Sequence, residues 1–156
     1  MKRREFITLL CGAAAWPLAA RAQQPDRMRR IGVLMAFAEN DVEAQSWVAG
    51  FREELGKLGW TDGHNIQIDT RWATADVVSL RRLAKELVAL RPDFVLTGST
   101  PATAAMHRKT SNIPIIFVMV GDPVGSGFVA SLSRPGGNLT GLPLSRTRWA
   151  ASGLSC

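Results

Sequence analysis

The sequence has few residues of the kinds that form disulfides or bind metals. Its 156 residues include two cysteines, Cys11 and Cys156, and two histidines, His64 and His107. Both cysteines lie near the ends of the chain, so the region between them offers neither a disulfide framework nor a thiolate metal site. Neither histidine has a candidate catalytic or metal-binding partner nearby in sequence. We therefore predict no metal site and no histidine-based catalysis.

Motifs typical of enzymes and nucleotide-binding proteins are also absent. Residues 98–102 read Gly-Ser-Thr-Pro-Ala, which is not a G-x-S-x-G nucleophile elbow, and no Walker or G-x-G-x-x-G series follows the first apolar run. That run ends in Ala36-Phe37-Ala38, without the adjacent acidic pair that a phosphoacceptor metal site needs. The sequence thus predicts no enzymatic activity and no cofactor. A flavodoxin-like or receiver-like regulatory domain remains as an alternative class.

The chain lacks a basic stripe outside its ends. Its formal net charge is +6, but most of this excess lies in residues 1–22 and in the last fourteen residues. The remaining residues, 23–142, carry 13 basic and 12 acidic side chains. A nearly neutral body argues against nucleic acid as a partner.

The apolar stretch at the N-terminus, Phe6 to Ala20, is too short for a membrane-spanning helix, which needs about 20 residues. It follows the charged start Lys2-Arg3-Arg4 and is closed by Ala20-Arg21-Ala22, the order of regions in a cleavable export signal. The paired arginines resemble the twin-arginine type, although Lys2 and Thr8 depart from its usual flanks. We predict that residues 1–22 are an export signal cleaved after Ala22 and that the protein is periplasmic.

Apolar periodicity in the rest of the chain predicts strands that alternate with helices. Continuous apolar runs predict buried strands at 31–37, 94–96 and 115–120, whereas 66–72 alternates apolar and polar residues like an edge strand. A fifth strand is expected to start at 139–142. Helical spacing predicts helices at 40–58, 76–91 and 100–107, and a short one around Phe128, Val129 and Leu132. Asn40 and Thr100 are the expected N-caps of the first and third of these helices. The fold class is therefore three-layer α/β with a parallel sheet of flavodoxin-like order 2-1-3-4-5.

The stretch from Asp93 to Met106 looks built to hold a ligand. A short apolar strand is followed by Gly98, Ser99 and Thr100, and Pro101 suits the first helical position. The free N–H groups near Ala102 and Thr103 would then favour an anion such as a carboxylate. An ordinary capped strand-to-helix turn has the same pattern, and the stretch alone leaves both interpretations open.

The predicted strand order adds an independent reason to favour this stretch. The chain reverses direction in the sheet between the first and third strands, and ligands bind at the carboxyl ends of strands that flank such a switch point. The loops at that edge are Phe37 to Asp41 and Gly98 to Ala102, with Gly121-Asp122-Pro123 beside them.

Several segments together carry a family resemblance. They are RIGVLMAF, ELGKLGW, TDGHNIQIDTRWA, LRPDFVLTGSTPATAA and IPIIFVMVGDPVGSGFVASLSRPGGNLTGL. From about Arg30 to Leu142 the chain resembles the periplasmic substrate-binding proteins of ABC importers, in the family similar to tryptophan- and tyrosine-binding components. The resemblance implies two α/β lobes that close on a small, amino-acid-like ligand, and an ABC permease as partner.

By the same resemblance, the first-lobe contacts would come from the three loops at the switch point. Ser99, Thr100 and Ala102 would hold a ligand carboxylate, and Phe37 and Asn40 would contribute from the neighbouring loop. Asp122 would bind an ammonium group or brace its own loop, and the residues leave both roles open.

Residues 143–156 show no apolar periodicity, and they fit neither a strand nor a hinge. We expect residues 23–142 to form the first lobe and this tail to be a frameshifted or truncated end without regular structure. The chain as given would then bind its ligand only weakly, and a partly folded fragment without function is the alternative.

Overall fold

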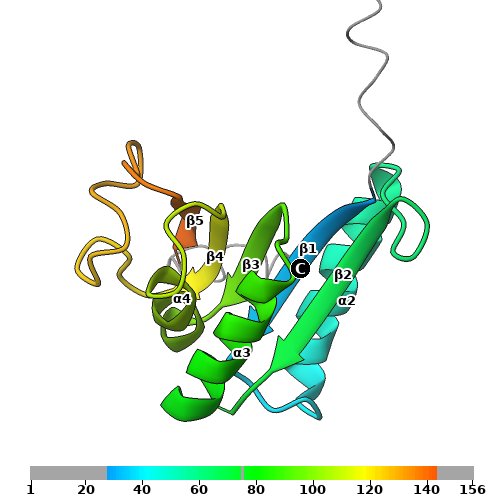
Figure 1. Ribbon diagram of the computed structural model, residues 1–156, viewed down its shortest axis with the longest axis horizontal. Coiled ribbons are helices and arrows are strands. Elements are labelled where there is room, and N and C mark those ends of the chain that lie inside the picture. Colours follow the sequence, from blue (N-terminus) through cyan, green and yellow to red (C-terminus); the bar gives the residue numbers. More distant parts are fainter. Residues whose placement is uncertain (1–27, 75, 144–156) are drawn as a thin grey trace, which may run out of the picture.

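The computed structural model describes residues 28–74 and 76–143, which form a parallel sheet with helices on both faces (Figure 1). The strands are β1 (Arg29–Met35), β2 (Ile66–Trp72), β3 (Phe94–Gly98), β4 (Ile115–Val120) and β5 (Leu139–Pro143). They lie in the order β2-β1-β3-β4-β5, and each pair is parallel. The predicted fold class and strand order are therefore confirmed. The predicted export signal lies outside the described residues, as does the predicted tail apart from Pro143.

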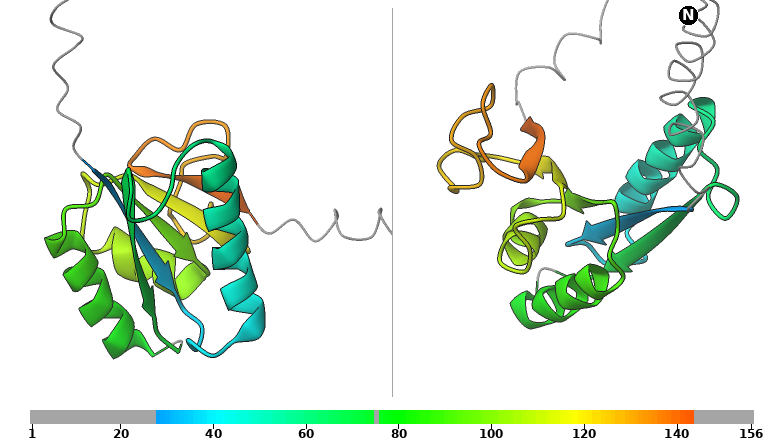
Figure 2. Two further views of the ribbon diagram at one scale, coloured as in Figure 1. Left: turned by 90° about the vertical axis from the view of Figure 1, so that its right-hand side faces the viewer. Right: turned by 45° about the horizontal axis from the view of Figure 1, so that its top comes forward.

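The sheet separates two apolar layers (Figure 2). On one face, α3 (Val77–Ala89) and α4 (Thr100–His107) pack Leu80, Leu87 and Met106 against buried strand residues such as Phe117. On the other face, α2 (Val42–Lys57) packs Val48, with partly buried Phe51 and Leu55, against β1 and β2. Side chains of one strand alternate between these layers, as the two-residue period of a strand requires.

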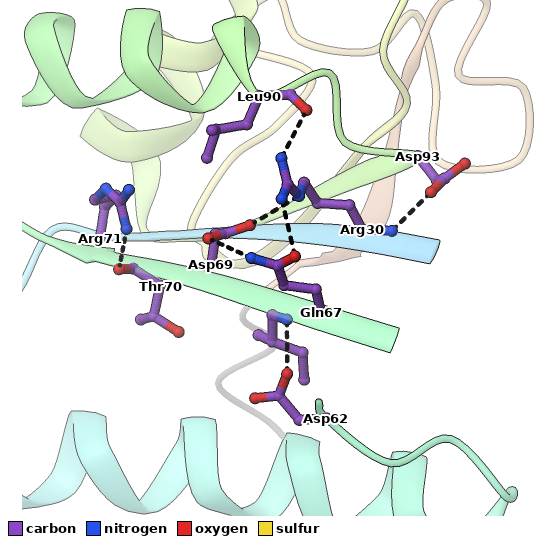
Figure 3. Close-up of polar contacts among 9 residues, drawn as sticks. Arg30, Asp62, Gln67, Asp69, Thr70, Arg71, Leu90 and Asp93 are labelled. Atoms are coloured by element: carbon purple, nitrogen blue, oxygen red, sulfur yellow. Dashed lines mark hydrogen bonds and ion pairs between the residues drawn. The ribbon is translucent and has the colours of Figure 1, made fainter. Parts of the chain in front are cut away.

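Arg30 ties the edge strand and the connection after α3 to the centre of the sheet (Figure 3). Its guanidinium donates to the Leu90 carbonyl at 3.3 Å and to Gln67 Oε1 at 2.8 Å, and its Nε forms an ion pair with Asp69 Oδ2 at 3.2 Å. Its backbone N–H donates to the Asp93 carboxylate at 2.8 Å. The polar residues of β2 that the alternating pattern assigned to a solvated face are thus half-buried in this network.

Two helices begin one residue away from the predicted cap. The N-cap of α2 is Asp41 and not Asn40, because Asp41 Oδ1 accepts hydrogen bonds from the N–H groups of Glu43 and Ala44, both at 3.0 Å. The N-cap of α4 is Ser99 and not Thr100, which lies inside the helix. The start predicted for α3 is confirmed, and Asp76 is its N-cap, since its carboxylate accepts from the N–H groups of Val78 and Ser79.

The short helix predicted around Phe128 is wrong. Residues 121–135 form successive turns, in which Ser126 N–H donates to the Asp122 carbonyl and Phe128 N–H to the Pro123 carbonyl, both at 3.0 Å. Gly127 has a φ of +72°, outside the right-handed helical region, so the helical hydrogen-bond pattern stops there. Leu58 and Val77 fit the helical spacing of apolar residues at 40–58 and 76–91, but they are 76% and 51% exposed.

Candidate functional site

The carboxyl ends of β1 and β3 lie side by side, at the predicted switch point. Met35 pairs with Gly98 in the sheet, and the N–H of Ala36 donates to the Gly98 carbonyl at 3.4 Å. A side chain at residue 98 would collide with Met35, because an added Cβ would lie 2.6 Å from its sulfur. Glycine at this position therefore leaves room for the Met35 side chain over the end of β3, and a larger residue would require that flexible side chain to move.

Ser99 has an unusual backbone for a residue with a side chain. Its φ of 94° and ψ of 160° lie in a region that is nearly restricted to glycine. Its N–H donates to the Val118 carbonyl of β4 at 3.1 Å, and its carbonyl accepts from the N–H of Thr103 at 3.1 Å. The conformation is therefore fixed by β4 on one side and by α4 on the other.

A buried threonine pair supports this turn from below. Thr97 and Thr103 are both fully buried, and their hydroxyl oxygens lie 2.9 Å apart. The Thr103 hydroxyl also donates to the Ser99 carbonyl at 2.8 Å. This buried pair was not predicted from the sequence. A threonine within an apolar strand and another within an alanine-rich helix are nevertheless the pattern that indicates buried hydroxyl groups.

The Ser99 hydroxyl takes no part in these hydrogen bonds. Its oxygen is buried and has no hydrogen-bond partner within the described part of the chain. A buried hydroxyl without a partner costs roughly 1–3 kcal/mol, so such groups call for a specific explanation. Its position, at the start of a helix that follows a switch-point strand, is the one at which the sequence predicted a ligand contact.

The N–H groups that were predicted to be free at the start of α4, near Ala102 and Thr103, are not both free. The N–H of Thr103 is used by the Ser99 carbonyl, and Ala102 is completely buried. Thr100 is half-buried, and Pro101 has no N–H to offer. Among the predicted residues of this turn, Ser99 and Thr100 are thus the two that are only half-buried.

The remaining predicted site residues lie at the same edge of the sheet but do not contact Ser99 through hydrogen bonds among the described residues. Phe37 is half-buried and packs edge-on against Trp47 of α2, with ring centroids 5.4 Å apart. Asn40 is exposed. Asp122 is exposed as well, and its Oδ1 accepts from the N–H of Gly125 at 2.7 Å, so Asp122 does brace its own loop.

Trp47 is the second feature that the sequence analysis missed. It is 37% exposed and forms, with Phe37, an aromatic pair next to the end of β1. From the sequence, Trp47 could be placed only on the surface of a helix. Its contact with Phe37 could not be predicted, because that contact depends on how α2 packs.

The described residues contain no group of three or more His, Cys, Asp or Glu side chains that could hold a metal ion. None of their helices is both long and apolar enough to cross a membrane.

Residues 30–147 match the family model for ABC transporter substrate binding proteins. The chain belongs to this family. Over 92 residues it is 40% identical to a tyrosine-binding protein of Clostridioides difficile (strain R20291), a match that covers 59% of this chain and 27% of that protein.

Two solved structures of the family have the same fold. A ligand-free, open substrate-binding protein with adhesive properties from Clostridium difficile is 32% identical and superposes with a TM-score of 0.67. An ABC domain from Streptococcus pneumoniae in complex with L-Trp is 30% identical, with a TM-score of 0.68. Each match covers 74% of this chain but only 38% of the solved chain. The described region thus corresponds to one α/β lobe of the type I periplasmic-binding-protein fold.

Proposed function

We propose that this chain forms the first lobe of a periplasmic receptor that binds an amino-acid-like ligand and presents it to an ABC permease. The main support for this proposal comes from residues 98–100, which join β3 to α4 and are called the Ser99 turn below. A strained backbone and a buried, unpartnered hydroxyl meet where the strand order reverses, and such features cluster at ligand-binding sites. The export signal proposed for residues 1–22 fits a periplasmic receptor, because the ligand would be met outside the cytoplasm.

In the proposed complex, Ser99 and Thr100 hold the ligand carboxylate. The hydroxyl of Ser99 donates to it, and the positive end of the α4 dipole adds a favourable field. Ala102 contributes by fixing the helix start against the core, since it is completely buried.

The other predicted residues supply the remaining contacts. Phe37, supported by Trp47, offers an apolar face to an aromatic side chain. Asn40 and Asp122 are exposed at the same edge, where an amide and a carboxylate can bind the ligand ammonium group. The relatives named above for tyrosine and bound to L-Trp support an aromatic amino acid as the first ligand to test.

The experiment is an NMR titration of the full chain with L-tryptophan and, as a control, with indole, which lacks both the carboxylate and the ammonium group. We expect tryptophan to shift the backbone amides of 36–41 and 98–102 more than indole does. The double variant Ser99→Ala, Thr100→Ala should weaken tryptophan binding about tenfold or more, because hydrogen bonds to a charged group are worth roughly 1.5–3 kcal/mol. Ser111→Ala, in an exposed loop, is the matched control.

Two results would count against the proposal. Shifts confined to residues away from these two loops would place the site elsewhere. Equal shifts with indole and tryptophan would show that the Ser99 turn does not recognise a carboxylate.

A further inference from the structure

A groove runs between α3 and α4, on the face of the sheet opposite α2. Its volume is about 170 Å³. Val77, Leu80 and Arg81 line it from α3, and Pro101, Ala104 and Arg108 from α4. Its lining is apolar except for the two arginines, and both of these are exposed.

The surface around this α3–α4 groove is rich in unneutralised positive charge. Arg81 and Lys85 lie on α3, and Arg108 and Lys109 follow α4. Among the described residues, no ion pair or side-chain hydrogen bond joins Arg81 or Arg108 to a carboxylate. The acidic residue of α3, Glu86, is engaged by Arg82 at 2.7 Å and by Arg71 at 3.7 Å.

The helix on the other face is different. On α2, Lys57 is paired with both Glu53 and Glu54, at 3.1 Å and 2.8 Å. The net charge of residues 23–142 is therefore close to zero although the two faces differ: the α3–α4 face has cations without acidic partners among the described residues, whereas Lys57 on α2 is paired. An occupant of the α3–α4 groove must be apolar at its centre and negative at its edges.

We propose that the α3–α4 groove docks a short acidic segment of another protein. One large apolar side chain of that segment enters the hollow, and carboxylates on either side pair with Arg81 and Arg108. The apolar lining suits this, because Val77, Leu80, Pro101 and Ala104 offer hydrocarbon surface to an apolar side chain. The guanidinium group suits it as well, since it binds carboxylates through two parallel hydrogen bonds.

The apolar lining favours a protein segment over the other anionic partners. Phosphates of nucleic acid or of a lipid surface would need a row of cations, whereas here the space between the arginines is apolar. Val77 and Val78, which are 51% and 74% exposed, extend this apolar surface at the start of α3. The proposal does not depend on the ligand site at Ser99.

The test is selection of binders to the full chain from a random peptide display library. We expect the selected peptides to share a Phe, Leu or Trp flanked by Asp or Glu. Binding of the strongest peptide should fall about tenfold or more in the double variant Arg81→Glu, Arg108→Glu, because each substitution replaces an attraction by a repulsion. The matched control Lys85→Glu, Lys109→Glu makes the same change in net charge beside the groove and should weaken binding much less.

A second variant leaves the charge unchanged. Ala104→Trp fills the hollow and should abolish peptide binding, with the helical circular dichroism signal kept as evidence that the chain is folded. Selected peptides without the acidic and apolar pattern, or equal losses in the two charge-reversed variants, would overturn the proposal. Tighter Arg81- and Arg108-dependent binding to phosphatidylserine vesicles or to a single-stranded oligonucleotide would overturn it as well.

Discussion

Ser99 has a backbone conformation that lowers the stability of the fold, and its hydroxyl is the group that we propose binds the ligand. A side chain in this region of φ and ψ costs about 1–3 kcal/mol, and it persists only where the surroundings impose it. Here the imposing groups are the Val118 carbonyl and the two donors of Thr103. A glycine would satisfy the same backbone without strain, so the hydroxyl is the feature that a serine adds.

We therefore expect Ser99→Gly to raise the free energy of unfolding by about 1 kcal/mol. The relieved strain, about 1–3 kcal/mol, exceeds the roughly 0.4–1 kcal/mol that a new glycine costs through the flexibility of the unfolded chain. Urea unfolding measures the change. Ser111→Gly, at a residue whose φ is not positive, is the control and should be destabilising. If Ser99→Gly lowers stability as much as Ser111→Gly, the strain argument is wrong.

At the scale of elements, apolar periodicity predicted the strands well but could not identify the caps. Continuous apolar runs gave β1, β3 and β4 because these strands are covered on both faces. Asn40 and Asp41 are both good capping residues, and the choice between them depends on where the loop after β1 places the first helical turn.

The turns after β4 were mispredicted for a related reason. Val129 is buried and Phe128 half-buried, as they would be in a helix, so an apolar pattern alone could not separate the two structures. The glycine conformation at Gly127 decides between them, and a sequence shows only that such a conformation is allowed.

The N-cap of α3 gives a prediction about pH. A hydrogen bond from the Ser79 side chain, followed by those from the backbone N–H groups of Ser79 and Val78, lowers the pKa of Asp76 below its ordinary value. A carboxyl whose pKa is lower in the folded chain stabilises the fold above its unfolded pKa, near 4, and this contribution is lost as the pH falls through the folded value.

The variant Asp76→Asn isolates this effect, because asparagine still caps a helix but does not titrate there. Thermal unfolding of both proteins from neutral pH to about pH 2 should show the stability of the natural protein falling, relative to the variant, below about pH 4. A difference between the two proteins that stays constant through this range would contradict the assignment.

At the scale of the whole molecule, the strand order was predictable from the sequence. The location of the proposed ligand site was inferred from that order. The alternating pattern of residues 66–72 identified the edge strand, and right-handed connections then fixed the order of the rest. The same reasoning could not find the Trp47 contact or the α3–α4 groove, because both depend on how helices pack against one another.

The chain spans 27% of the curated relative and 38% of the solved ones that it matches. A receptor of two lobes gains affinity by burying its ligand between them, whereas a single lobe leaves one side of the bound ligand open to water. We therefore expect the chain alone to bind aromatic amino acids about a thousandfold more weakly than a complete receptor would, a difference of about 4 kcal/mol.

Calorimetry of the purified chain against tryptophan, tyrosine and branched-chain amino acids measures this affinity, and light scattering reports the association state. We also expect self-association, because Leu142 at the β5 edge is 74% exposed and exposed strand edges pair readily. Ser99→Ala should weaken any binding of these amino acids that remains, whereas Ser111→Ala should leave the affinity unchanged. Micromolar or tighter binding by a monomer would show that one lobe is sufficient, since the Ser99 turn would then hold its ligand without a second surface to exclude water.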